Sequence, residues 1–269
     1  MYPSLTSAFF VYFTRVLRIC IGDNETLVNN DAIINNGTTT NGTNLRILPL
    51  GDSITFGFNE ASGNSYRRYL ECMLYQAGNG VQYIGSLKNG NWSDNANDGF
   101  SGQTIDQIGI TGNPEIIGTP KANVFLVHAG TNDMDQNLNI TYAPFRLGTL
   151  IDEVTVSNPD ALVLVAQIIV NANTTVNDWI KTYNEALPAV VGARSKNVRL
   201  VSMDKVLVGD LLDGTHPNEG GYLKMANAWY PALMSARNEG LIMLATQPFT
   251  NEGGSSLPAG GGNCSTLTS

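Results

Sequence analysis

The sequence predicts an α/β domain built as a three-layer α/β/α sandwich around a five-stranded parallel sheet. Two observations lead to this prediction: short apolar runs recur at wide intervals, and amphipathic helical stretches lie between them. The runs are near-continuous instead of alternating, which is typical of strands buried on both faces of a parallel sheet. Strand and helix in alternation favour parallel pairing through right-handed crossovers.

Five apolar runs are expected to form the strands, and each is rich in Leu or in β-branched residues. They cover residues 45–50, 81–85, 124–130, 162–169 and 198–203. In a sheet of this kind, ligands bind beyond the carboxyl ends of the strands. The residues that directly follow each run are therefore the candidates for chemistry.

Helical spacing is visible between the later runs and after the last one. The final helix is expected to place five apolar side chains on one face: Tyr222, Met225, Ala226, Trp229 and Leu233. This spacing is that of an amphipathic helix packed on a core. Similar patterns occur over 145–154 and 179–187, and Pro188 is expected to kink or end the second of these helices.

Composition excludes several classes of protein. The chain has 269 residues, of which 42% are hydrophobic and 14% are charged, so it can form a large core and is not a disordered chain. A formal net charge of −8 argues against nucleic acid or an anionic membrane surface as the main partner. No apolar run reaches the roughly 20 residues that a bilayer span requires, and no membrane partner is expected.

The chain divides into three parts by composition. Residues 1–43 are expected to be an N-terminal segment with a polar linker that contains NNGTTTNGTN. Residues 44–246 are expected to be the folded domain. Residues 247–269 are rich in Gly and Ser and are expected to be a flexible tail.

Glycosylation sequons indicate a secreted, extracellular glycoprotein, because an N-x-[ST] sequon can be glycosylated only in a secreted chain. The sequence holds seven of them, at Asn24, Asn36, Asn41, Asn91, Asn139, Asn173 and Asn263. The N-terminus differs from a secretory signal, since Arg15 and Arg18 follow the short apolar stretch 8–13 instead of preceding it. A degenerate signal, a signal-anchor remnant and a misassigned start all stay open.

The cysteines do not decide the compartment. Cys20, Cys72 and Cys264 are an odd number, so at least one has no partner within the chain, and the pairing stays open. The chain has no CxxC spacing and only two histidines, so no structural zinc site is expected.

Polar motifs follow three of the expected strands. Ser53 comes after Gly51 on a sharp strand-to-helix turn, where a nucleophile would be exposed, although a Ser there can also simply cap a helix. Gly102 can offer a backbone N–H and Asn132 a side-chain amide, but both are also ordinary turn residues. No G-x-S-x-G occurs, which argues against an ordinary α/β-hydrolase.

Asp213 and His216 lie three residues apart on a turn before the last expected helix. At this spacing the carboxylate can accept from the imidazole N–H, which leaves the second ring nitrogen free as a base. The other histidine, His128, ends an apolar run and is expected to be a partly buried, hydrogen-bonded side chain. If the protein uses a histidine base, His216 is the candidate.

In this order, the motifs resemble those of the SGNH hydrolase (GDSL esterase) superfamily. LPLGDSITFG, DGFSGQTIDQI, HAGTNDM and DGTHPNEGGYLKMANAWY are similar to carbohydrate esterase family 3, an acetylxylan-esterase-like group, over about residues 45–234. The resemblance implies the flavodoxin-like SGNH hydrolase fold. One departure is Asn97-Asp98, where that family often carries His-Glu, and it leaves the substrate preference at this loop open.

The resemblance implies a serine esterase that removes acetyl or other short acyl groups from carbohydrate, chiefly acetylated xylan. Ser53 would be the nucleophile, His216 the base and Asp213 the residue that orients it. The backbone N–H groups of Ser53 and Gly102 and the amide of Asn132 would form the oxyanion hole. No metal and no organic cofactor are required, and the expected partner is an acetylated polysaccharide or a small ester.

Two alternatives stay open: a general short-chain esterase or lipase of the same superfamily, and a non-catalytic glycan-binding module. A long apolar lid would favour a lipase, and the sequence has none. Loss of Ser53, Asp213 or His216 would favour the module, and all three are present. Four aromatic side chains are candidates for stacking on sugar rings, with core packing as the competing explanation: Phe58, Tyr66, Trp92 and Phe100.

Overall fold

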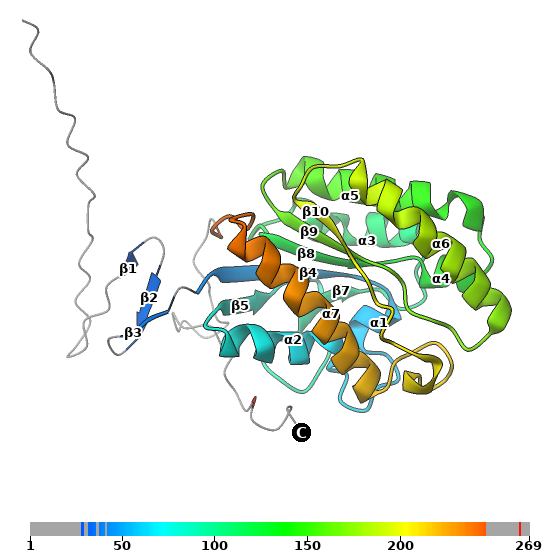
Figure 1. Ribbon diagram of the computed structural model, residues 1–269, viewed down its shortest axis with the longest axis horizontal. Coiled ribbons are helices and arrows are strands. Elements are labelled where there is room, and N and C mark those ends of the chain that lie inside the picture. The colour runs from blue at the N-terminus through cyan, green and yellow to red at the C-terminus, as the bar shows by residue number, and fades with distance from the viewer. Residues whose placement is uncertain (1–27, 30–31, 36–37, 41, 246–263, 265–269) are drawn as a thin grey trace, which may run out of the picture. The chain divides into compact units, whose positions relative to one another are not determined.

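The computed structural model describes residues 28–29, 32–35, 38–40, 42–245 and 264 (Figure 1). The chain forms two compact units, Met1–Gly42 and Thr43–Ser269. In the first unit, three short strands form an antiparallel sheet: β1 (Val28–Asn29), β2 (Ala32–Asn35) and β3 (Thr38–Thr40). They lie within residues 1–43, where β1 precedes the polar stretch NNGTTTNGTN and β3 falls inside it. The apolar start and, apart from Cys264, the expected tail lie outside the described residues.

The second unit contains the expected parallel sheet. In spatial order its five parallel strands are β5 (Gly80–Tyr83), β4 (Asn44–Gly51), β8 (Val124–His128), β9 (Leu162–Ala166) and β10 (Val198–Val201). In chain order these strands run 2-1-3-4-5, which is the flavodoxin-like arrangement. The predicted fold class is confirmed.

The strand count was wrong by two, because β6 (Leu87–Lys88) and β7 (Ala96–Gly99) extend the sheet to seven strands. β5 pairs with Asn44–Ile47 of β4, whereas β7 pairs in parallel with Leu50 and Gly51 at the end of the same strand. β7 therefore continues this side of β4 where β5 has ended. Its sequence, ANDG, contains no apolar run, which is why a prediction from apolar runs does not find it.

Helices cover both faces of the sheet (Figure 1). On one face lie α2 (Ser65–Gln76) and α7 (Glu219–Asn238), and on the other α3 (Ile105–Ile117), α5 (Ala143–Ser157) and α6 (Thr174–Gly192). Two short helices, α1 (Ser53–Phe56) and α4 (Thr131–Asp135), directly follow β4 and β8, and two 3-10 turns cover Ile140–Tyr142 and Val208–Asp210. Pro188 lies inside α6 and does not end it.

The core forms one layer on each side of the sheet. Leu48 and Leu50 of β4 pack towards α3 and α5, and Leu45 and Ile47 pack towards α2 and α7. All four are fully buried, as expected when alternate side chains of a strand enter two hydrophobic layers. Burial on both faces explains the near-continuous apolar runs of the sequence.

One disulfide closes a long loop in the second unit. It joins Cys72 of α2 to Cys264, at a sequence separation of 192, and both residues are buried. This answers the pairing that the sequence left open. Of the helices that the structure describes, none combines the length and the apolar character that crossing a bilayer requires.

Candidate active site

The carboxyl ends of β4, β7 and β8 meet at one edge of the sheet. Gly51, the last residue of β4, pairs with Gly99 of β7 on one side and with His128 of β8 on the other. The segments that follow these strands therefore begin side by side. They carry Ser53, Gly102 and Asn132, three of the residues that the sequence singled out.

Ser53 begins the one-turn helix α1. Asp52 caps this helix, and its carboxylate accepts the Ile54 N–H at 2.9 Å. Gly51 is required by space, because a Cβ there would lie 2.4 Å from the His128 carbonyl oxygen. The turn is thus packed directly against β8, and Ser53 is only 7% exposed.

His216 bridges Ser53 and Asp213. Its Nε2 lies 2.9 Å from Ser53 Oγ, and its Nδ1 lies 2.8 Å from Asp213 Oδ2. When Nδ1 carries the proton and donates it to the carboxylate, Nε2 is left to accept from the serine hydroxyl. The structure therefore brings together three side chains that the sequence singled out, although His216 is 163 positions from Ser53.

Hydrogen bonds keep Asp213 charged. Its Oδ1 accepts the N–H groups of Thr215 at 3.0 Å and of His216 at 2.8 Å. Partial burial acts to raise the pKa of Asp213, but the hydrogen bonds from His216 and Thr215 outweigh burial and hold the pKa well below its ordinary value. A further donor, the side chain of Asn59, lies 2.9 Å from Oδ2, and no motif in the sequence marks it.

The turn that carries Asp213 and His216 is held from two sides. The Leu212 N–H donates to the His216 carbonyl at 2.7 Å, which closes the turn. From the loop after β9, the amide of the buried Asn171 donates to Thr215 Oγ1 at 3.0 Å. The imidazole is consequently oriented by the fold before any ligand binds, which is what an acid–base group requires.

Gly102 lies on a tight turn beside Ser53. The Gln103 N–H donates to the Phe100 carbonyl at 3.1 Å, and Gly102 has φ +79, a left-handed value that glycine adopts without strain. The Phe100 N–H donates in turn to the Gly51 carbonyl at 2.9 Å, which holds the start of the turn against the end of β4. Outside Gly102 and its two chain neighbours, no atom of the described residues lies within 4 Å of the position that a Cβ of Gly102 would take.

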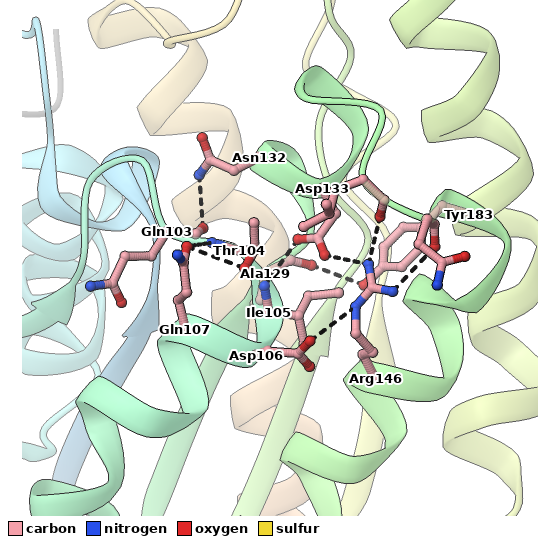
Figure 2. A network of polar contacts seen from close by, with 12 residues as sticks. Gln103, Thr104, Ile105, Asp106, Gln107, Ala129, Asn132, Asp133, Arg146 and Tyr183 are labelled. Carbon is pink, nitrogen blue, oxygen red and sulfur yellow. Dashed lines mark hydrogen bonds and ion pairs between the residues drawn. The ribbon is translucent and has the colours of Figure 1, made fainter.

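The amide of Asn132 connects the third loop to this turn. Its Nδ2 donates to the Gln103 carbonyl at 2.9 Å (Figure 2). An amide nitrogen carries two hydrogens, so this bond orients the group and uses only one of them. The second hydrogen is the one that a ligand can take.

A buried ionic network fixes the backbone around Asn132 (Figure 2). The carboxylate of Asp133, which is fully buried, accepts the Ile105 N–H at 2.9 Å and the Arg146 guanidinium at 2.6 Å. Arg146 lies 3.6 Å from Asp106, and the Tyr183 hydroxyl donates to the Ala129 carbonyl at 2.9 Å. These contacts tie the starts of α3 and α4 together and thereby hold the second and third loops in register.

His128 differs from the expectation of a partly buried, hydrogen-bonded side chain. It is 0% exposed, and neither ring nitrogen has a hydrogen-bond partner among the described residues. Burial lowers the pKa of His128, although Asp52, whose Oδ1 lies 4.0 Å from Nδ1, acts in the opposite direction. His128 is therefore a neutral core residue at neutral pH, and His216 is the histidine at the sheet edge.

Of the four aromatic candidates for sugar stacking, only Phe58 lies open beside the triad. Tyr66 and Phe100 are buried in the core, and the Arg67 guanidinium covers the Trp92 ring at 5.1 Å from its centroid. Phe58 is 48% exposed, and its ring centroid lies 5.1 Å from that of His216.

The departure at Asn97-Asp98 is accommodated inside the protein. Both side chains are fully buried. Asn97 Oδ1 accepts the Gly99 N–H at 3.0 Å, and Asp98 Oδ1 accepts both the N–H and the hydroxyl of Ser86, at 2.7 and 2.8 Å. Burial raises the pKa of Asp98 to about 6, against the two Ser86 hydrogen bonds, which lower it. These two residues support β7 from within.

The free energy of unfolding of the wild type is expected to fall as pH rises from about 4 to about 7, and Asp98→Asn is expected to reduce this fall. A carboxyl group whose pKa is higher in the folded than in the unfolded protein stabilises the fold below its unfolded pKa, near 3.9, and this contribution is lost as pH rises through the folded pKa of about 6. The effect is on the order of 3 kcal/mol, because the pKa rises by about 2 units and each unit corresponds to about 1.4 kcal/mol. Urea unfolding of both proteins at several pH values measures it, and parallel curves for the two would contradict it.

The flavodoxin-like order of the sheet, with Ser, Gly, Asn and His after β4, β7, β8 and β10 at its carboxyl edge, defines a hydrolase of the SGNH class. The chain belongs to the GDSL-like Lipase/Acylhydrolase family, whose model matches residues 50–224.

Three similar proteins are carbohydrate esterases or esterases by description. The family 3 carbohydrate esterase of Clostridium thermocellum is 30% identical, with a TM-score of 0.65 and coverage of 73% of this chain and 99% of that chain. A family 3 carbohydrate esterase from Talaromyces cellulolyticus, 21% identical with a TM-score of 0.63 and coverage of 72% and 99%, shows likeness of fold alone. A multidomain esterase of Ruminococcus flavefaciens is 32% identical over 216 residues, which are 69% of this chain and 28% of the relative's length.

Proposed function

We propose that this chain is a serine esterase that removes acetyl groups from carbohydrate, with acetylated xylan as its substrate. The observation that carries the proposal is the chain of hydrogen bonds from Ser53 through His216 to Asp213 at the edge of the sheet. Membership of an acylhydrolase family supports an ester as the substrate. The family 3 carbohydrate esterase of Clostridium thermocellum, at 30% identity, supports a sugar as the alcohol part.

In the first half of the proposed reaction, Ser53 Oγ attacks the carbonyl carbon of the ester while His216 Nε2 takes the hydroxyl proton. The tetrahedral intermediate then collapses, the bond to the sugar oxygen breaks, and the imidazolium gives its proton to that oxygen. Asp213 stabilises the imidazolium and keeps the ring oriented. In the second half, His216 takes a proton from a water molecule whose oxygen attacks the acetyl carbonyl carbon. The bond from that carbon to Ser53 Oγ then breaks, the imidazolium returns its proton to Oγ, and acetic acid leaves and ionises to acetate.

The negative charge of the tetrahedral intermediate needs donors beside Ser53. We assign this role to the backbone N–H groups of Ser53 and Gly102 and to the Asn132 amide, which come from three adjacent loops. The left-handed turn at Gly102 and the orientation of the amide by the Gln103 carbonyl support the assignment. Donors fixed by the fold stabilise charge without reorganising during the reaction.

The test is a comparison of ester substrates. We expect faster turnover of p-nitrophenyl acetate than of the butyrate and longer esters, together with release of acetate from acetylated xylan. Hydrolysis of the small esters with no acetate from xylan would favour a general short-chain esterase or lipase. Binding of xylan without hydrolysis of any ester would favour a glycan-binding module.

Phe58→Ala is expected to raise KM for acetylated xylo-oligosaccharides by about 5-fold, because a stacked ring contributes on the order of 1 kcal/mol. KM for p-nitrophenyl acetate, which carries no sugar, should change much less. A matched control is Phe145→Ala on α5, since Phe145 is 75% exposed and is not part of the described site. Equal changes for both substrates would show that Phe58 only supports the His216 ring.

We also propose that the protein is secreted and glycosylated. The disulfide between Cys72 and Cys264 supports an oxidising compartment, because disulfides persist there and are rare in the cytosol. The sequon residues Asn91, Asn139 and Asn173 are exposed, as a glycan requires. Mass spectrometry of protein recovered from the medium tests this, and recovery from the cell interior alone would refute it.

A further inference from the structure

The side chain of Asn59 donates a hydrogen bond to Asp213, the acid of the proposed triad, although Asn59 lies outside the turn that carries Asp213 and His216. Its Nδ2 donates to Asp213 Oδ2 at 2.9 Å, the same oxygen that accepts from His216 Nδ1 at 2.8 Å. The other carboxylate oxygen is taken by the backbone N–H groups of Thr215 and His216. The carboxylate therefore accepts four hydrogen bonds, and the one from Asn59 crosses 154 positions of the chain.

The backbone at Asn59 has a left-handed conformation. Its φ is +65, a left-handed value that Asn adopts more readily than most residues with a Cβ. The chain before it is closed onto the nucleophile, because the N–H groups of Gly57 and Phe58 both donate to the Ser53 carbonyl at 3.0 Å. One short segment thus carries Ser53 at its start and Asn59 at its end.

A buried arginine holds this segment in place. The guanidinium of Arg67 donates to the carbonyl oxygens of Thr55 at 3.0 Å, Phe56 at 3.1 Å and Gly63 at 3.1 Å. Arg67 is fully buried, so these bonds are shielded from water and stronger than surface contacts. The position of Asn59 is consequently set by the same contacts that set the loop after Ser53.

We propose that Asn59 is a positioning residue that holds the Asp213 carboxylate against the His216 imidazole and ties their turn to the segment that bears Ser53. This inference rests on the proposed esterase function. The side chain of Asp213 is 35% exposed, so water can replace the amide as a donor but cannot hold the carboxylate in one orientation. Oδ2 accepts a hydrogen bond from the Asn59 amide as well as from His216 Nδ1. It therefore attracts the imidazole proton less strongly than it would with His216 as its sole donor.

Two substitutions separate these effects. Asn59→Gly removes the amide, and glycine adopts the left-handed backbone at this position without strain. We expect this variant to have a kcat for p-nitrophenyl acetate about 10-fold lower than the wild type and a KM within about 2-fold of it. Asn59→Asp keeps the shape and places a second carboxylate beside Asp213, so it should lower kcat further. It should also move the acidic limb of the kcat/KM profile upward by about 0.5 to 1 pH unit, because added negative charge favours the imidazolium.

The matched control is Asn137→Gly. Asn137 is exposed and also has a left-handed backbone, with φ +51, so the substitution makes the same chemical change away from Asp213. Its kcat and pH profile should equal those of the wild type. Thermal unfolding of every variant shows whether a loss of activity comes from loss of the fold.

The deciding measurement is a double-mutant cycle with Asp213→Ala. If Asn59 acts through Asp213, Asn59→Gly should cause no further loss in the Asp213→Ala background. An equal loss in both backgrounds, or a wild-type rate and pH profile for both Asn59 variants, would overturn the inference. Absence of ester hydrolysis by the wild type would instead refute the proposed function, so the two failures can be told apart.

Discussion

Ser53→Ala is expected to lower kcat for p-nitrophenyl acetate and for acetate release from acetylated xylan by about 10⁴-fold or more. The substitution removes the atom that forms the acyl-enzyme, and no neighbouring side chain can take its place at the 2.9 Å contact with His216 Nε2. Steady-state assays on purified protein measure the effect. Ester hydrolysis at the wild-type rate would refute the assignment of the nucleophile.

The fold should survive this change. The Ser53 hydroxyl contacts the His216 ring at the edge of the sheet, and the helix cap of α1 depends on Asp52 instead. We expect a loss in the free energy of unfolding of less than about 1 kcal/mol. Ser195→Ala is a suitable control, because Ser195 is exposed in the turn before β10, and both activity and stability should stay unchanged.

Asn132→Ala is expected to lower kcat by about 10²- to 10³-fold, the usual cost of one oxyanion donor. KM should change little, because the donor binds the charge that develops in the transition state more strongly than the neutral carbonyl of the substrate. The measurement is a comparison of kcat and KM for p-nitrophenyl acetate. A variant within a few-fold of the wild type in kcat would contradict the role.

A control is needed because Asn132 also ties two loops together through the Gln103 carbonyl. Gln136 makes a comparable tie, since its Nε2 lies 3.4 Å from the Gly102 carbonyl oxygen and its side chain is exposed. Gln136→Ala should therefore lower kcat by less than about 3-fold. If it lowers kcat as much as Asn132→Ala does, the position of the loop is the cause and the amide is not the donor.

Features that depend on neighbours in the chain were predicted well from the sequence. The five apolar runs correspond to the five parallel strands, most clearly for β4, β8 and β9, which are buried almost throughout and are therefore apolar in sequence. The contact between Asp213 and His216 spans three residues of one turn, so the spacing alone allows it. The order of the motifs then suffices to identify the superfamily.

Other features were missed or misjudged because polar residues can be buried by distant segments. β7 carries Asn97 and Asp98 in its interior positions, and it forms a strand by pairing with the end of β4 and with β6. His128 looks like a residue that needs a hydrogen bond, yet the core encloses it without one among the described residues. Tyr66 and Phe100 resemble a sugar-binding surface in the sequence and are core residues in the fold.

The sequence by itself determined the class of the fold and singled out the turns at Ser53 and at 213–216, since each depends on hydrophobic periodicity or on contacts within a few residues. Only the tertiary structure decided which loops meet. The pairing of β7 with Gly51 brings the Gly102 loop beside Ser53, and the contact of Asn59 with Asp213 joins two distant turns. Such contacts arise when the sheet assembles and its register is set, and no local pattern in the chain records them.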